Sequence, residues 1–167
     1  MGPSSGDRSI PRHPVRWRAV TVLTLGGGAA FWLANFAISR TSIAAEYRAA
    51  LSISYTPMLL DALLGGLIIG LGVSVVLLRF FERVPGQDPL RKSILLSVVA
   101  LLIVTLLIEL PATWSTATHH ALRYFVIGAV FNTIRIVALG AVIGSLYRGL
   151  AKWGPLDNAA PAPKVDR

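Results

Sequence analysis

The feature that most constrains this sequence is a set of four long apolar runs that are almost free of charge. They cover residues 19–39, 57–78, 93–108 and 124–147. Only Asp61 and Arg135 interrupt them, and Glu109 directly follows the third run. The hydrocarbon core of a bilayer needs about 20 apolar residues, and a crossing segment must be a helix because lipid offers backbone amides no hydrogen-bond partners. The sequence therefore predicts an all-α membrane protein, a four-helix transmembrane bundle.

The composition excludes most other classes of protein. Hydrophobic residues make up 54% of the 167 residues and charged residues only 14%, whereas soluble domains contain about 25% charged residues. Cysteine is absent, which excludes disulfides, Cys-ligated zinc, iron–sulfur clusters and thiol nucleophiles. A net charge of +8 would suggest nucleic-acid binding in a soluble protein. Here the basic residues are distributed as membrane topology requires, which explains the positive charge. We therefore expect no nucleic-acid partner.

The predicted organisation is one transmembrane domain, residues 16–154, between two tails. Its spans are expected at about 18–39, 57–79, 90–110 and 119–150. The third span should begin at Asp88-Pro89, since this pair is typical of an N-cap followed by proline in the first helical turn. Residues 1–15 and 155–167 are rich in proline and charge, and we expect them to be disordered cytoplasmic tails.

The basic residues are distributed unevenly between the two ends of the predicted bundle. Twelve of the 16 precede the first span, connect the second to the third, or follow the fourth. Only Arg40, Arg48 and Arg123 lie on the other side. Because short loops rich in Lys and Arg stay in the cytoplasm, this 12:3 split predicts a multi-pass protein of the cell inner (plasma) membrane with both termini cytoplasmic.

The segment between the first two spans has its own periodicity. Ile43, Tyr47, Leu51 and Tyr55 recur at every fourth residue within 41–56. This pattern indicates a short amphipathic helix lying on the outer surface of the membrane. An extension of the first or second span beyond the bilayer explains the pattern equally well, so both interpretations stay open.

Small residues indicate where the predicted helices approach one another. The second span carries Gly66 and Gly70, and the fourth carries Gly140 and Gly144, each pair at four-residue spacing. Such faces let helix backbones approach closely, and this packing is a main source of stability between helices in lipid. We interpret these glycines as packing residues. The alternative is that they line a pore or form a homodimer seam.

Five polar residues should meet in the outer half of the bundle. Arg135 lies close to the midplane, while Asp61 and Glu109 lie near the outer ends of their helices. Asn132 is one helical turn outward from Arg135, and Asn35 is at similar depth in the first span. A charge inside a bilayer needs a partner or a watery cavity. One interpretation is a structural ion pair that locks the bundle. The other is a binding or conduction site whose excess carboxylate holds a proton, a cation or a zwitterionic head group.

No sequence motif indicates catalysis, a metal site or a cofactor. The sequence contains no G-x-S-x-G, H-E-x-x-H, P-loop or dinucleotide fingerprint. The adjacent His119 and His120 would point about 100° apart on a helix, which is unsuited to joint metal ligation. We therefore expect a non-enzymatic accessory or partner-binding membrane subunit in a lipid bilayer, bound to a membrane protein or to copies of itself. The alternative function is a small oligomeric transporter or channel that uses the polar cluster.

Overall fold

The computed structural model of the chain describes residues 17–109 and 121–152, without the side chains of residues 108 and 109. Its elements are α1 (Trp17–Ser39), α2 (Ser42–Ala50), α3 (Tyr55–Arg79), the 3-10 turn η1 (Phe81–Arg83), α4 (Pro89–Val104), the π-helical turn η2 (Thr105–Glu109) and α6 (Ala121–Lys152). The described part of the chain contains no strands. The two expected tails lie outside the described residues.

Four helices are long and apolar enough to cross a membrane: α1, α3, α4 with the start of η2, and α6. Their bounds lie close to the expected spans wherever the chain is described. The prediction of an all-α bundle with four spans is therefore confirmed. The protein is a multi-pass membrane protein.

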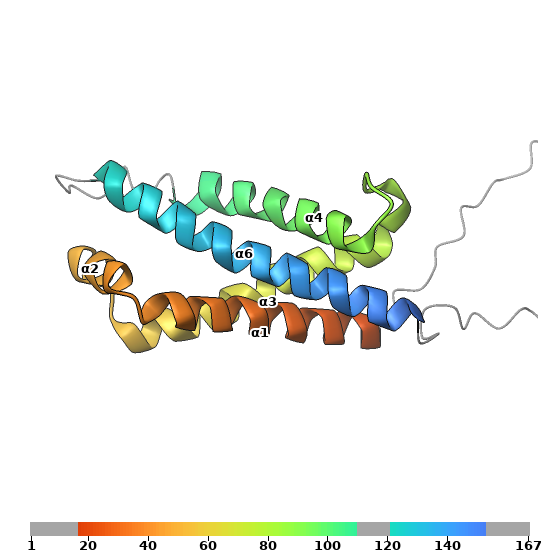
Figure 1. Cartoon of the computed structure of the whole chain (residues 1–167), viewed down its shortest axis with the longest axis horizontal. Coiled ribbons are helices and arrows are strands. Elements are labelled where there is room, and N and C mark those ends of the chain that lie inside the picture. Colours follow the sequence, from red (N-terminus) through yellow and green to blue (C-terminus); the bar gives the residue numbers. More distant parts are fainter. Residues whose placement is uncertain (1–16, 110–120, 153–167) are drawn as a thin grey trace, which may run out of the picture.

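The four long helices run alternately up and down (Figure 1). Helix α1 packs extensively against both α3 and α6, and α6 also packs against α4, whereas α3 and α4 share a smaller contact. The described chain begins and ends at the same end of the bundle, at Trp17 and Lys152 (Figure 1). We call the other end, where α2 lies, the α2 end.

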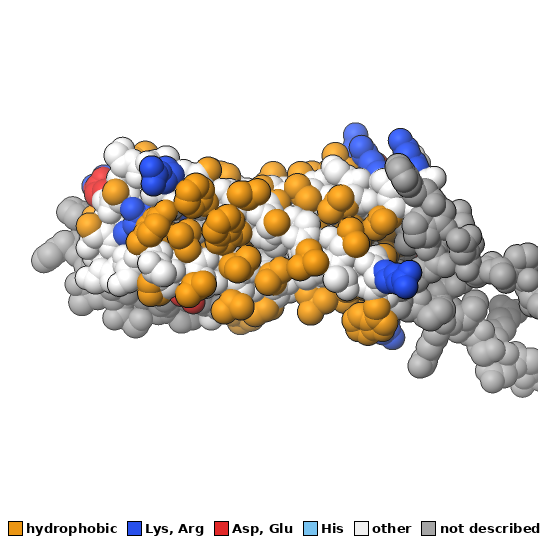
Figure 2. Space-filling model, turned by 90° about the horizontal axis from the view of Figure 1, so that it is seen from below, with side chains coloured by type: hydrophobic (Ala, Val, Ile, Leu, Met, Phe, Trp, Pro, Cys, Tyr) orange, Lys and Arg blue, Asp and Glu red, His pale blue; other side chains and the backbone are white. Residues whose placement is uncertain are grey.

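Hydrophobic side chains cover the middle of the molecule. On the face shown in Figure 2 they are spread over the middle of the molecule among backbone and other side chains, and Lys and Arg lie near the two ends. Large apolar side chains are widely exposed, among them Ile68 at 71% and Leu122 at 76%. A monomeric soluble protein rarely exposes so large a contiguous apolar surface. These faces suit contact with lipid chains or with another transmembrane helix.

The apolar core fills the half of the bundle away from α2. It is formed between α1, α3 and α6 by side chains that are at most 1% exposed: Leu23, Leu77, Ile136, Leu139 and Ile143. Close packing of such side chains is typical of protein interiors.

The two glycines expected to pack on α3 lie against α1. A Cβ atom added at Gly66 would lie 2.9 Å from the ring of Phe31. One added at Gly70 would lie 3.2 Å from the backbone oxygen of Thr24. The absence of a side chain at both positions therefore lets the two helices approach closely.

The two glycines expected to pack on α6 lie against α4. A Cβ atom added at Gly140 would lie 2.6 Å from the hydroxyl oxygen of Ser97, and one added at Gly144 would lie 2.7 Å from the Cα atom of Leu90. The short distance also allows a hydrogen bond between the helices, because the Ser93 hydroxyl donates to the carbonyl oxygen of Gly140 at 2.8 Å.

A separate short helix, α2, follows α1. Its N-cap is Thr41, whose hydroxyl accepts a hydrogen bond from the amide of Ala44 at 3.2 Å. On the face of α2 that packs against the bundle, Ala44 takes the place expected for Ile43. Ala44 is buried, whereas Ile43 is 54% exposed, and Tyr55 belongs to α3. The shift arises because the small Ala44 is the residue of α2 that fits against the bundle, which leaves the bulky Ile43 pointing away.

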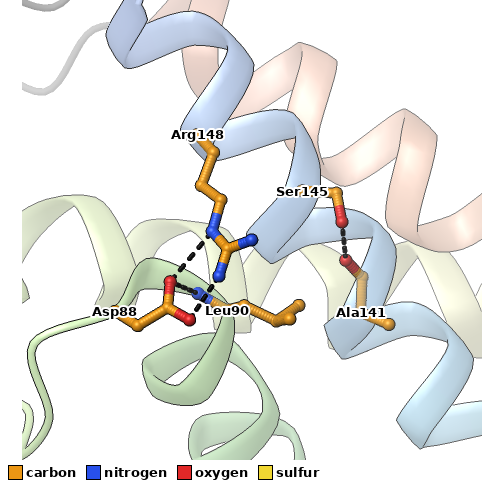
Figure 3. A network of polar contacts seen from close by, with 5 residues as sticks. All are labelled: Asp88, Leu90, Ala141, Ser145 and Arg148. Carbon is orange, nitrogen blue, oxygen red and sulfur yellow. Dashed lines mark hydrogen bonds and ion pairs between the residues drawn. The ribbon is translucent and has the colours of Figure 1, made fainter.

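A charged contact joins α4 to α6 at the end opposite α2 (Figure 3). Asp88 is the N-cap of α4, and one carboxylate oxygen accepts from the amide of Leu90 at 3.2 Å and from Nε of Arg148 at 2.9 Å. The other carboxylate oxygen pairs with Nη2 of Arg148. The hydrogen bond from Arg148 is the main cause that lowers the pKa of Asp88 below its ordinary value.

We expect Gly144→Ala to destabilise the bundle by about 1–3 kcal/mol, because the new methyl group would overlap the backbone of Leu90 and force α4 away from α6. Gly149→Ala is the matched control on the same helix, since a Cβ there would meet no atom within 4 Å. Thermal unfolding in detergent measures both variants. Equal melting temperatures for the two variants would contradict the close contact between α4 and α6.

We expect Asp88→Asn to melt below the wild-type protein at neutral pH, with the difference lost in acid. Asparagine keeps the N-cap and removes only the ion pair with Arg148. Because the folded-state pKa of Asp88 is lowered, its stabilisation is fully present above the unfolded-state pKa of about 3.9 and disappears as the pH falls through the folded-state value. Melting curves from pH 7 downward check this, and a difference that does not begin to shrink below about pH 3.9 would contradict it.

Candidate functional site

A partly open cavity of about 170 Å³ lies at the α2 end of the bundle. Four helices contribute to its walls: the last turns of α1, the inner face of α2, the first turn of α3 and the first half of α6. The lining residues are Asn35, Ile38, Ser39, Ala44, Tyr47, Arg48, Ile53, Met58, Gly128, Phe131, Asn132 and Arg135. The cavity therefore combines apolar walls with several polar and two cationic groups.

Three members of the expected polar cluster meet at this cavity. Asn35, Asn132 and Arg135 all line it. Nη1 of Arg135 donates to Oδ1 of Asn132 at 2.9 Å, so the two residues one turn apart on α6 bond directly. The guanidinium of Arg135 also lies 6.0 Å from the ring centre of Phe31 on α1. The structure thus places Arg135 in the bundle interior, half-buried between α1 and α6.

Of the remaining two members of the cluster, Asp61 does not line the cavity. Asp61 is exposed on α3 and forms no ion pair with any residue that the structure describes. The expectation that Asp61 approaches Arg135 is therefore not met. The reason is angular, because Asp61 lies about 100° around the helix from Ala62, which begins the buried stripe of α3. The backbone of Glu109 ends η2, and its side chain lies outside the described part.

Asn35 occupies a position that an apolar residue would normally fill. It continues the buried stripe of α1 formed by Gly28, Phe31 and Ser39, and its side chain is 1% exposed. Neither Oδ1 nor Nδ2 of Asn35 has a hydrogen-bond partner among the residues that the structure describes. A buried polar group left unpaired costs about 1–3 kcal/mol. The amide therefore faces the cavity at the expense of stability.

Helix α2 forms one wall of the cavity because it is fastened to α6. Glu46 pairs with Arg123 at 2.8 Å. The ring of Tyr47 packs edge-on against Phe131, with ring centres 5.8 Å apart. Gly128 makes room for this tyrosine, because a Cβ there would lie 2.9 Å from the Tyr47 hydroxyl. These contacts hold α2 across the end of the bundle.

Arg48 links α2 to the two neighbouring helices. Its Nη1 donates to the carbonyl oxygen of Ser39 at the end of α1, at 3.0 Å. Its guanidinium lies over the ring of Tyr55 at the start of α3, 5.2 Å from the ring centre. Sequence reasoning missed Arg48, Tyr47 and Ser39 as site residues because neither interpretation of the segment 41–56, a surface helix or an extension of a span, packs it against the fourth span. One sequence feature could have indicated Arg48: it is one of only three basic residues predicted on its side of the membrane.

No metal site is evident in the described ranges, which contain no group of three or more His, Asp or Glu side chains that could hold an ion. His119 and His120 lie outside those ranges.

Comparison with protein-family models, with curated proteins and with solved structures found no match.

We expect Asn35→Leu to leave the melting temperature of the purified protein unchanged or to raise it. Leucine has a similar volume and removes two buried polar atoms that lack protein partners. Thermal unfolding in detergent measures the effect, and Asn35→Ala, which loses volume in the same place, is the control that should melt lower. A loss for Asn35→Leu as large as that for Asn35→Ala would contradict the conclusion that the amide is held at a cost.

Proposed function

We propose that this protein is a non-enzymatic, partner-binding subunit of a membrane assembly, and that α3 receives a transmembrane helix of a different protein. The observation that carries the proposal is Asp61, an exposed carboxylate within a helix that is apolar enough to span the membrane. A charge facing lipid is costly and implies a partner that supplies the opposite charge. The partner helix should therefore carry Lys or Arg at the depth of Asp61.

The face of α3 that carries Asp61 also has the spacing and the small residues of a helix-docking seam. Asp61, Gly65, Ile68 and Gly72 follow one another at intervals of four, three and four residues, the spacing of a left-handed helix pair. A Cβ at Gly65 or Gly72 would meet no atom within 4 Å, in contrast to Gly66 and Gly70 on the other side of the helix. A lipid-facing surface gains nothing from glycine, whereas a helix interface gains close approach.

A different protein fits this seam better than a second copy does. Two copies in one membrane share the same orientation, so a symmetric pairing of α3 with α3 would bring the two Asp61 carboxylates together. Like charges so placed repel one another.

The distribution of basic residues supports the orientation expected from the sequence. In this orientation the protein spans the cell inner (plasma) membrane with both termini in the cytoplasm, and the α2 end faces outward.

A small oligomeric transporter or channel is the second candidate function, because polar residues line the cavity. The polar residues Asn35, Asn132 and Arg135 line a space of the kind that such a function needs. Below them, however, the core side chains fill the interior between α1, α3 and α6. A path through one protomer would need this core to open, which favours the helix-docking function.

Photocrosslinking in native membranes tests the proposal. A photoreactive amino acid in place of Ile68 should form an adduct with one membrane protein, and mass spectrometry should map it to a transmembrane helix containing Lys or Arg. The same amino acid in place of Leu33, which is similarly exposed on α1, is the control and should give no such adduct. Asp61→Lys should abolish the adduct, and reversing the charge of the partner's basic residue should restore it.

Two results would contradict the proposal. An adduct of two copies of this chain would identify the seam as a homodimer interface. Equal yields from the Ile68 and Leu33 positions would show that the face of α3 is not selective. Because Asp61 is exposed and has no ion pair among the described residues, Asp61→Lys should melt like the wild-type protein, so loss of the adduct would not reflect unfolding.

A further inference from the structure

We infer that the cavity at the α2 end is a binding site for a phosphate group, carried by an anionic lipid of the outer leaflet or present as free phosphate. This inference concerns a different surface from the helix-docking seam on α3 and does not depend on it. Three independent properties of the cavity support it: the unpaired polar atoms of Asn35, the charge of Arg48, which its described contacts do not neutralise, and a size that matches a small group.

The unpaired polar atoms belong to Asn35. Its amide is nine-tenths buried or more, lines the cavity, and has neither donor nor acceptor satisfied within the described residues. Natural proteins rarely keep a buried amide in this condition unless water or a ligand completes it. Water alone would satisfy the amide, so the choice between water and a ligand depends on the charge around it.

The described lining of the cavity is positively charged. Arg48 supplies the guanidinium group that an anion would meet, and no Asp or Glu is among the described lining residues. Glu46, the acidic residue of α2, is already paired with Arg123. Within the described ranges, the guanidinium of Arg48 contacts a carbonyl oxygen and an aromatic ring, and neither contact neutralises its charge. A half-buried guanidinium without a carboxylate suits an oxyanion, because its donors match phosphate oxygens in geometry and charge.

The N-terminal end of α3 adds a smaller positive contribution to the charge around the cavity. Met58 in the first turn of α3 lines the cavity, and the N-cap residue Ser54 makes no side-chain capping hydrogen bond. The N-terminal end of a helix carries partial positive charge and directs free amide groups outward. An anion near Met58 would therefore be stabilised by the helix as well as by Arg48.

The size and walls of the cavity fit a head group better than a large ligand. A volume of about 170 Å³ is below the roughly 300–1,000 Å³ of sites for drug-sized molecules. Ile38, Met58 and Phe131 provide apolar walls beside the polar groups. A lipid phosphate could enter this space while its acyl chains stay against the apolar outer surface. Free phosphate would use the same polar groups without the apolar ones.

The test uses the full chain, delipidated and purified in a detergent with an uncharged head group. Native mass spectrometry measures binding of phosphatidylglycerol and of phosphatidylcholine, and thermal unfolding measures stabilisation by inorganic phosphate against chloride at equal ionic strength. The variants are Arg48→Gln and Asn35→Leu. Arg40→Gln is the matched control, because Arg40 is exposed beside α2 and does not line the cavity.

We expect the wild-type protein and Arg40→Gln to hold one phosphatidylglycerol in preference to phosphatidylcholine. Arg48→Gln and Asn35→Leu should each bind it about tenfold more weakly, as expected for the loss of a hydrogen bond to a charged group. Saturable stabilisation by inorganic phosphate that the same two variants weaken would identify free phosphate as the source. Binding of phosphatidylglycerol without any effect of inorganic phosphate would identify the lipid.

Other results would overturn the inference. Equal weakening by Arg40→Gln and Arg48→Gln would show only a general attraction of surface charge. Equal binding of the two lipids together with no response to inorganic phosphate would show that the site does not recognise an anion. Because Arg48 also holds α2 to α1, unchanged binding in Asn35→Leu would count against the site even if Arg48→Gln loses binding.

Discussion

The close approach of helix backbones at glycines is the constraint on which the rest of this structure depends. In lipid, apolar side chains gain little from meeting one another instead of acyl chains, so helices associate where their backbones come near enough for tight packing and short hydrogen bonds. Gly70 meets the backbone of α1 and Gly144 meets the backbone of α4, so neither contact could accept a larger side chain without a shift of the helices. These contacts close one half of the bundle around an apolar core.

The other half of the bundle is built differently. At the α2 end the interior contains Asn35 and Arg135 in place of leucine or isoleucine, and α2 crosses the opening, held by the pair of Glu46 with Arg123. The result is a cavity closed by packing on one side and walled by a short, charged helix on the other. Such an arrangement serves binding at one face of the membrane better than passage across it. The face of α3 that carries Asp61 is exposed and is separate from this cavity.

Much of the fold follows from the sequence, because four apolar runs bounded by charges have few alternatives in a membrane. The buried stripe of α3 through Gly66 and Gly70 also follows from four-residue spacing. The site was only partly predictable. The depth of each residue along its helix placed Asn35, Asn132 and Arg135 together correctly. Depth does not tell which way a side chain points around the helix axis. Asp61 is separated from the buried stripe of α3 by a rotation of about 100° around that axis. The role of Arg48 depends on how α2 folds back onto α6, a tertiary contact that periodicity does not contain.

The most direct test of this account measures which side chains water can reach. The chain contains no cysteine, so single cysteines can be labelled with a membrane-impermeant maleimide without background. The account predicts that Asn132→Cys in the cavity wall reacts from the α2 side only, and that Ser74→Cys, fully buried in the other half of the bundle, reacts from neither side. Labelling of Ser74→Cys would reveal a continuous aqueous path through the bundle and contradict a cavity closed by helix packing.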